Sequence, residues 1–228
     1  LLSRIASPGT AGIADGILSV VGAQRTASTL VVDTTATEVT VSDPAGLRAG
    51  GGCTQATSTS VRCDGTRFSH ANVSAGDRDD LIRVAGPMPT SLDGGPGADR
   101  LSGGTGADVL AGDAGRDTLD YGSRSVPLRL TVNNKADDGA AGEGDLIAAD
   151  VEFMVGGAAN DTMVGSAAAE GFFGQGGNDT LDGGLGGDWL NGGAGRDTVD
   201  YGSRSVPLSL THDNKADDGA AGEGDLIA

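Results

Sequence analysis

Aspartate recurs every nine residues along two stretches of this sequence, and a large apolar residue follows each aspartate two positions later. Within 94–120 the consecutive nonapeptides GGPGADRLS, GGTGADVLA and GDAGRDTLD hold this phase, and within 156–200 it continues in GQGGNDTLD, GGLGGDWLN and GGAGRDTVD. Carboxylates and turn carbonyls together supply the oxygen ligands that calcium accepts in loose geometry, whereas magnesium demands a tight octahedron and keeps its waters. The spacing therefore predicts a row of calcium sites.

The repeating unit can be written G-G-x-G-x-D-x-U-x, where U is a large aliphatic residue. Glycines at the first, second and fourth positions allow positive φ values and a tight turn. The x-U-x segment is typical of a very short strand in which only the central side chain points inward. With one nonapeptide per half-turn, alternate strands would stack about 4.8 Å apart. Carboxylates about 5 Å apart repel by about 3 kcal/mol at an effective dielectric near 20, so a divalent cation is needed between turns.

Composition limits the fold that can position these carboxylates. Glycine contributes 41 of the 228 residues and aromatic residues only 3%, so the core must be narrow and built from Val, Leu, Ile and Ala. Apolar residues do not recur at helical spacing, and glycine interrupts nearly every window. Residues 1–75 lack the nonapeptide pattern but alternate as strands do, for example in STLVVDTTATEVTVSD. We predict an all-β fold, a right-handed parallel β-roll or β-solenoid with short strands and Gly-Asp turns.

The charge balance excludes several classes of partner and activity. The 32 acidic and 15 basic residues give a formal net charge of −17, which disfavours nucleic acid and anionic membranes. No apolar run approaches membrane-spanning length, so we expect no membrane insertion.

The residues also do not indicate a zinc site, because His70 and His212 lack a nearby thiol cluster. The sequence contains neither a GxSxG elbow nor an HExxH motif, so we expect a protein that is not an enzyme.

Cys53 and Cys63 are the two cysteines, and their spacing fits neither a metal-binding pair nor a redox motif. We expect a disulfide that closes a short loop, and two reduced buried thiols are the alternative. Such a loop would contribute roughly 2–3 kcal/mol through chain entropy and would require an oxidising compartment. We therefore expect a secreted, extracellular or cell-surface protein.

An eighty-residue repeat overlies the short one. The segment GRDTLDYGSRSVPLRLTVNNKADDGAAGEGDLIA at 115–148 recurs at 195–228 with four differences. The chain begins at Leu1 and stops where the first copy continues, so we expect a piece of a longer array. This organisation predicts an N-terminal strand segment that caps or continues the solenoid, then two arrays with their inserts, at 1–75, 76–155 and 156–228.

The six nonapeptides resemble the RTX, or hemolysin-type, calcium-binding repeat. The resemblance is close over 94–120 and 156–200 and looser over most of the chain after residue 76. It implies a parallel β-roll with calcium between successive turns at each edge, in exported proteins that fold in calcium-rich surroundings. The ligating side chains that it implies are Asp99, Asp108, Asp117, Asp161, Asp179, Asp188 and Asp197. The turn glycines that it places at the metal sites are Gly94, Gly95, Gly97, Gly103, Gly104, Gly106, Gly112, Gly115, Gly174, Gly176, Gly177, Gly183, Gly184, Gly186, Gly192, Gly193 and Gly195.

Other acidic residues depart from the pattern and are weaker metal candidates. GSAAAEGFF has Glu170 where aspartate is expected, and Asp113 and Gln175 replace second-position glycines. The insert NNKADDGAAGEGDLIAADVE forms either a further calcium site or a solvated acidic loop. GDRDDLI at 76–82 places Asp77, Asp79 and Asp80 before an inward Leu81 and resembles a degenerate repeat. The weaker candidates are Glu170, Asp137, Asp138, Glu143, Asp145 and Asp79.

Two wider roles fit the sequence. One is a calcium-stabilised structural or adhesive module, with self-association or cell-surface contact, which the near-identical long repeats favour because stalks lengthen by duplication. The other is the non-catalytic calcium-binding portion of a secreted enzyme or toxin. In both roles several Ca²⁺ ions bind and couple to folding.

The order of the carboxylates along the second array also predicts their neighbours. With two nonapeptides per coil, we expect Asp179 between Asp161 and Asp197 on one edge of the roll, and Asp188 after Glu170 on the opposite edge.

Overall fold

The computed structural model describes residues 7–35, 37–205, 208–209, 218–220 and 224–228. In this part of the chain the regular structure is β, apart from one 3-10 turn, η1 (Gly65–Arg67). Two compact units form, unit 1 at Leu1–Asp117 and unit 2 at Thr118–Ala228. Short, mostly parallel strands confirm the all-β class predicted from the sequence. The division at 75/76 and 155/156, which follows repeat boundaries, stays a prediction.

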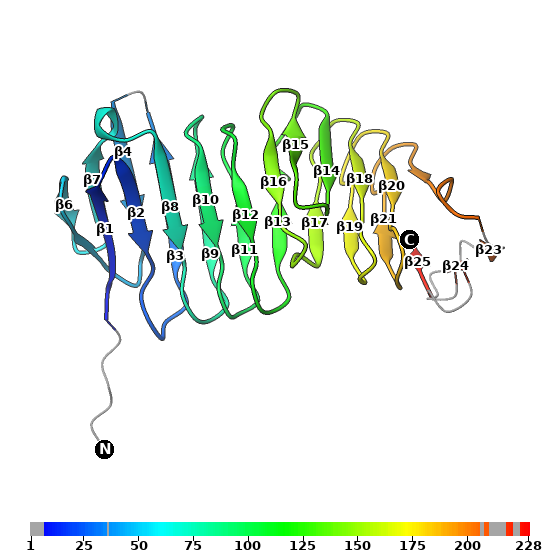
Figure 1. Cartoon of the computed structure of the whole chain (residues 1–228), viewed down its shortest axis with the longest axis horizontal. Helices are drawn as coiled ribbons and strands as arrows, with labels where there is room; N and C mark the ends of the chain where they lie inside the picture. Colours follow the sequence, from blue (N-terminus) through cyan, green and yellow to red (C-terminus); the bar gives the residue numbers. More distant parts are fainter. Residues whose placement is uncertain (1–6, 36, 206–207, 210–217, 221–223) are drawn as a thin grey trace, which may run out of the picture. The chain divides into compact units, whose positions relative to one another are not determined.

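Unit 1 contains strands of two sheets, which can be followed from blue to green in Figure 1. One has the order β12-β10-β8-β2-β1-β5, and only its β1/β2 pair is antiparallel. Its strands are β1 (Gly9–Ala14), β2 (Ile17–Val21), β5 (Leu47–Ala49), β8 (His70–Ser74), β10 (Thr90–Asp93) and β12 (Val109–Ala111). The other has the order β11-β9-β3-β4-β7-β6, parallel as far as β3 and antiparallel beyond it. Its strands are β3 (Thr29–Thr34), β4 (Glu38–Ser42), β6 (Cys53–Thr57), β7 (Ser60–Asp64), β9 (Leu81–Ala85) and β11 (Arg100–Ser102).

Unit 2 repeats this scheme with shorter strands. One row has the order β22-β20-β18-β14-β15-β16, in which only the β14/β15 and β15/β16 pairs are antiparallel. Its strands are β14 (Leu128–Thr131), β15 (Ala136–Ala140), β16 (Asp145–Ile147), β18 (Thr162–Val164), β20 (Thr180–Asp182) and β22 (Thr198–Val199). The parallel row β25-β21-β19-β17-β13 consists of β13 (Thr118–Asp120), β17 (Phe153–Val155), β19 (Gly171–Phe173), β21 (Trp189–Asn191) and β25 (Leu226–Ile227). A separate antiparallel pair joins β23 (Leu208–Ser209) to β24 (Gly219–Ala220).

The strand register explains the nine-residue period. Leu92 pairs with Leu110 in unit 1, and Phe172 pairs with Leu190 in unit 2, so one coil takes two nonapeptides. The residue at the eighth position is fully buried in every repeat but the last, where Val199 is half-buried, and its two neighbours are more exposed in strands such as β12 and β21. These side chains form the narrow core that the sequence predicted, and each contributes roughly 1.5–3 kcal/mol by its burial. The fully buried members are Leu101, Leu110, Leu119, Met163, Phe172, Leu181 and Leu190.

The predicted disulfide is present in the antiparallel part of unit 1. Cys53 lies opposite Cys63 across the β6/β7 pair, and their sulfur atoms are bonded at 2.06 Å. The bond therefore joins two adjacent strands of one hairpin.

The part of the chain that the structure describes contains no helix long and apolar enough to cross a membrane.

Candidate metal centre: a ladder of buried carboxylates

The sixth-position aspartates form a ladder in which each carboxylate binds the backbone of the preceding coil. In unit 1, Asp99 Oδ1 accepts a hydrogen bond from Asp80 N at 2.7 Å, and Asp117 Oδ1 accepts one from Asp99 N at 2.9 Å. On the other edge of the coil, Asp108 Oδ1 accepts from both the backbone N (2.8 Å) and the hydroxyl (2.6 Å) of Thr90. One oxygen of each carboxylate is thus occupied by the backbone.

Unit 2 has the same arrangement along both of its edges. Asp179 Oδ1 accepts from Asp161 N at 2.8 Å, and Asp197 Oδ1 accepts from Asp179 N at 3.0 Å. These bonds place Asp179 between Asp161 and Asp197, as the spacing predicted. On the opposite edge, Asp188 Oδ1 accepts from Glu170 N at 2.9 Å. The glutamate that replaces aspartate therefore still takes a place in the ladder.

The second oxygen of several ladder carboxylates is buried and has no hydrogen-bond partner. This holds for Oδ2 of Asp99, Asp179 and Asp188, whose residues are only 2%, 1% and 2% exposed, and for Glu170 Oε2. A buried charged oxygen without a partner costs several kcal/mol, by order of magnitude, unless an opposite charge compensates it. The donor set is suited to a hard cation, because these oxygens are anionic and buried without a hydrogen-bond donor.

The pKa values of the ladder carboxyl groups reflect this burial. Burial and the charges of Glu170 and Asp225 together raise the pKa of Asp188 to about 7, against the hydrogen bond from Glu170 N. Burial, with repulsion from Asp117 and Asp80, raises the pKa of Asp99 to about 6, against the hydrogen bond from Asp80 N. Without a counter-charge both groups therefore bind a proton more tightly than a solvated aspartate does. A cation at the ladder would lower both pKa values.

The first glycine of each repeat makes room for the second carboxylate oxygen. A Cβ atom at Gly174 would lie 2.2 Å from Asp179 Oδ2, and one at Gly94 would lie 2.5 Å from Asp99 Oδ2. Positive φ was expected at this position, but it does not occur at the first glycines. Space for the carboxylate, and not backbone conformation, selects glycine there. The same clash with the carboxylate of the repeat is found for Gly103, Gly112, Gly183 and Gly192.

The second and fourth glycines bring successive coils together. A Cβ at Gly95 would lie 2.1 Å from Gly76 O, and one at Gly195 would lie 1.5 Å from Gly177 O. Carbonyl oxygens of one coil therefore pack directly against the turn of the next coil. A close approach to the preceding coil also occurs at Gly97, Gly104, Gly106, Gly115, Gly177, Gly184, Gly186 and Gly193. At Gly176, a third position, a Cβ would make only ordinary contacts, 3.9 Å from Ala158 Cα and 4.0 Å from Ala194 O.

Two ladder members lie outside the predicted set. Asp188 N donates to Asp225 Oδ1 at 2.9 Å, and Asp225 is fully buried, so this edge continues beyond Asp188. In unit 1, Asp80 occupies the ladder position that the sequence analysis gave to Asp79, whose Oδ1 accepts a bond from Ala98 N instead. The D-x-U pattern is present at both places, in Asp-Leu-Ile at 225–227 and again at 80–82. That pattern was the signal that could have found them.

The assignment of Leu81 as an inward residue was wrong. Ile82 is fully buried at the core position, and Leu81 is only half-buried beside it. The coil from Asp80 to Asp99 contains 19 residues, one more than two nonapeptides. The extra residue shifts the phase by one position, which exchanges the inward and outward sides of the strand.

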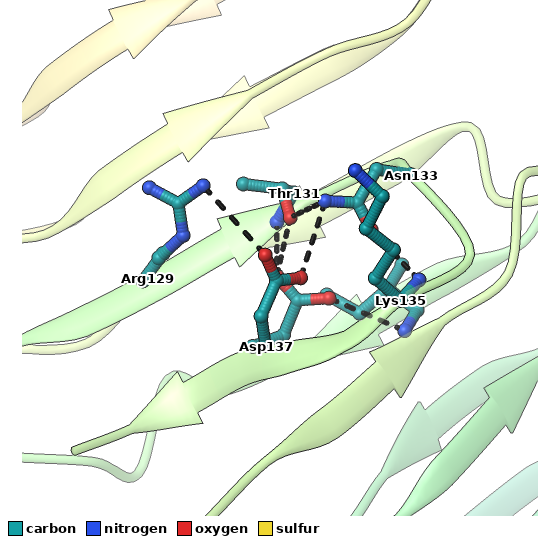
Figure 2. Close-up of polar contacts among 7 residues, drawn as sticks. Arg129, Thr131, Asn133, Lys135 and Asp137 are labelled. Atoms are coloured by element: carbon teal, nitrogen blue, oxygen red, sulfur yellow. Dashed lines mark hydrogen bonds and ion pairs between the residues drawn. The ribbon is translucent and has the colours of Figure 1, made fainter. Parts of the chain in front are cut away.

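The four acidic candidates of the insert are engaged by separate donors of the chain. Asp138 Oδ1 accepts bonds from Thr131 N and its hydroxyl, and Asp137 contacts Arg129 and Asn133, as Figure 2 shows for this cluster. The remaining two candidates, Glu143 and Asp145, lie near Gly139. There Glu143 pairs with Arg124, and Asp145 Oδ2 accepts a bond from Tyr121 OH at 2.8 Å.

The structure therefore does not bring these four residues to one site. Among the residues that it describes, no group of three or more His, Cys, Asp or Glu could hold a metal ion. An ion in the ladder must consequently combine carboxylates with backbone carbonyls or water. Of the two histidines, His70 contacts the Ser91 hydroxyl at 3.0 Å, and His212 lies outside the described residues.

Comparison with known protein families identifies the repeats that carry these carboxylates. The model of the RTX calcium-binding nonapeptide repeat matches residues 93–123 and 172–203, in four copies. The chain carries RTX calcium-binding nonapeptide repeats. The RTX repeats imply calcium binding, and together with the disulfide they suggest an extracellular protein. The mostly parallel rows of short strands are those of a β-roll. A search of curated proteins finds no match.

Proposed function

We propose that this chain is a secreted, non-catalytic module that binds several calcium ions along the carboxylate ladder and needs them to fold. The observation that carries the proposal is the row of buried Oδ2 atoms without hydrogen-bond partners at Asp99, Asp179 and Asp188. Calcium supplies positive charge and accepts the mixed oxygen ligands of a glycine-rich turn. The RTX match supports calcium over other hard cations.

The two carboxylate oxygens of each ladder aspartate bind different partners. Oδ1 of each aspartate is held by an N–H of the preceding coil, which fixes the carboxylate and leaves Oδ2 to the ion. Asp99, Asp179 and Asp188 each have a ladder neighbour on both sides. Because the ladder exists only in the stacked coils, calcium binds the folded state far better than the unfolded chain and stabilises it by mass action.

A structural or adhesive role is supported by features outside the ladder. Residues 115–148 and 195–228 are near-identical copies, and duplication of such a segment lengthens a stalk. In unit 2 an aromatic row lies on the outward side of β17, β19 and β21. Phe173 stacks with Phe153 at 6.4 Å and meets the edge of Trp189 at 5.1 Å, and Trp189 is 44% exposed. Such a row is suited to self-association or to contact with a cell surface.

Elemental analysis of bound calcium tests this function. The protein is desalted from calcium buffer or from magnesium buffer, and the metal content is measured for the parent chain and for Asp99→Asn, which keeps an Oδ1 acceptor for Asp80 N. Asp64→Asn is the control, because Asp64 is exposed and lies in β7. We expect several calcium ions per chain, little magnesium, and fewer ions only in Asp99→Asn. A parent chain without calcium would contradict the proposal.

A further inference from the structure

A buried carboxylate lies outside the matched repeats, at the end of the antiparallel strand β4 in unit 1. Asp43 is 0% exposed. Its Oδ1 accepts hydrogen bonds from Ala45 N at 2.9 Å and Thr29 N at 3.3 Å. Its Oδ2 is buried without a hydrogen-bond partner. The turn after β4 therefore uses one oxygen of this carboxylate and leaves the other unsatisfied.

Asp80 presents the same unsatisfied oxygen beside it. Asp80 is 4% exposed, its Oδ1 accepts a bond from Ser28 N at 2.5 Å, and its Oδ2 is buried without a partner. Ser28 and Thr29 are consecutive residues at the start of β3, so the two carboxylates bind neighbouring N–H groups. The two carboxylates are thus anchored to consecutive residues of the chain, and the charge of Asp43 lies close enough to act on Asp80.

The two groups repel each other. Burial raises the pKa of Asp80, and the charge of Asp43 raises it further, against the hydrogen bond from Ser28 N. Such an arrangement is costly without a compensating charge.

We propose that Asp43 and Asp80 hold a further divalent cation of the calcium class, where the parallel coils of unit 1 meet the antiparallel hairpin β3/β4. Oδ2 of each residue is a ligand, and backbone carbonyls or water complete the set. This site goes beyond the proposed function, because one carboxylate comes from the turn after the antiparallel strand β4 and both lie outside the matched residues 93–123 and 172–203. The ion would tie the hairpin to the first coil of the ladder.

Calcium counting on an isosteric variant tests the site. Asp43→Asn keeps the Oδ1 acceptor for Thr29 and Ala45 but removes the charge at Oδ2. Asp33→Asn is the matched control, because Asp33 is an exposed aspartate in the adjacent strand β3. Bound calcium is measured by equilibrium dialysis at saturating calcium. We expect about one ion fewer per chain in Asp43→Asn, and the full number in Asp33→Asn.

A second measurement separates metal binding from a purely structural role. In chelator, where we expect little β-structure, the β-signal of Asp43→Asn in far-ultraviolet circular dichroism should equal or exceed that of the parent chain, because one of two like charges is gone. In calcium the thermal midpoint of Asp43→Asn should fall below that of the parent. A full calcium count in Asp43→Asn, or a thermal midpoint in calcium equal to that of the parent, would overturn the site. A parent chain that binds no calcium would overturn both this site and the proposed function, whereas a full count in Asp43→Asn overturns this site alone.

Discussion

Replacing Asp188 with asparagine should change stability in opposite directions with and without calcium. Asp188 is 2% exposed, and its Oδ1 accepts a bond from Glu170 N at 2.9 Å. Asparagine preserves the size of the side chain and this acceptor. It removes the negative charge of the buried Oδ2, which has no hydrogen-bond partner.

The size of the stability change in chelator follows from the pKa of Asp188. Burial and neighbouring charges raise the pKa of Asp188 from 3.8 to about 7. At about 1.36 kcal/mol per pKa unit, ionising this group costs the cation-free fold roughly 4 kcal/mol at a pH above 7. That figure is the upper bound for the gain in unfolding free energy of Asp188→Asn in chelator. In calcium the same variant should lose stability, because it lacks a ligand for the ions on both sides.

Thermal unfolding followed by far-ultraviolet circular dichroism measures both effects. The parent, Asp188→Asn and Asp182→Asn are compared at about pH 8 in chelator and in calcium. Asp182 is the matched control, since it is a half-buried aspartate of β20 whose Oδ1 accepts a bond from Gly184 N, an acceptor that asparagine also retains. For Asp188→Asn alone we expect more β-signal before heating in chelator and a lower thermal midpoint in calcium. A β-signal in chelator below that of the parent would refute the reasoning.

Three further predictions follow from the same geometry. First, because the raised pKa values of Asp99 (about 6) and Asp188 (about 7) make the folded state bind protons more tightly, their stabilising protonation is complete below about pH 4 and lost as the pH rises through about 6 to 7. In chelator the β-signal in far-ultraviolet circular dichroism should therefore be larger at about pH 5 than at about pH 8, and the reverse order would contradict the burial of these charges. Second, Gln175 has a φ of 74° at a second position of the repeat, so Gln175→Gly should stabilise the chain by about 1 kcal/mol in urea unfolding. Gly193→Ala, at the equivalent position with a φ of 87°, should instead destabilise it, and a loss in both variants would argue against strain at this position. Third, denatured but unreduced protein should contain no free thiol, and replacing Cys53 and Cys63 by serine should cost about 3 kcal/mol through loop entropy. Two free thiols per chain would contradict the disulfide.

The repeat phase was sufficient to predict which side chains of the coils are buried. Because a strand alternates its side chains, a fixed nine-residue period places Leu101, Leu110 and Leu119 in the core without further information. The same period predicted that Asp179 lies between Asp161 and Asp197. The disulfide was predictable too, because Cys53 and Cys63 belong to two short segments that pair as a hairpin.

The period failed where the coil length changes or the chain direction reverses. One extra residue between Asp80 and Asp99 moved the ladder position from Asp79 to Asp80, and only the pairing of β9 with β11 reveals this shift. Asp225 comes 37 residues after Asp188, because the insert adds to the length of that coil. Asp43 lies in the turn after the antiparallel strand β4, so no repeat spacing relates it to Asp80. These residues meet through tertiary structure that the local pattern does not encode.

A calcium titration followed by far-ultraviolet circular dichroism tests the central claim most directly. The unneutralised ladder of Asp99, Asp179 and Asp188 should prevent the coils from stacking in chelator. We predict a largely unfolded spectrum in chelator and a cooperative gain of β-structure as calcium is added, with little gain from magnesium at the same concentration. Identical β-rich spectra in chelator and in calcium would contradict the claim that calcium binding in the ladder drives folding.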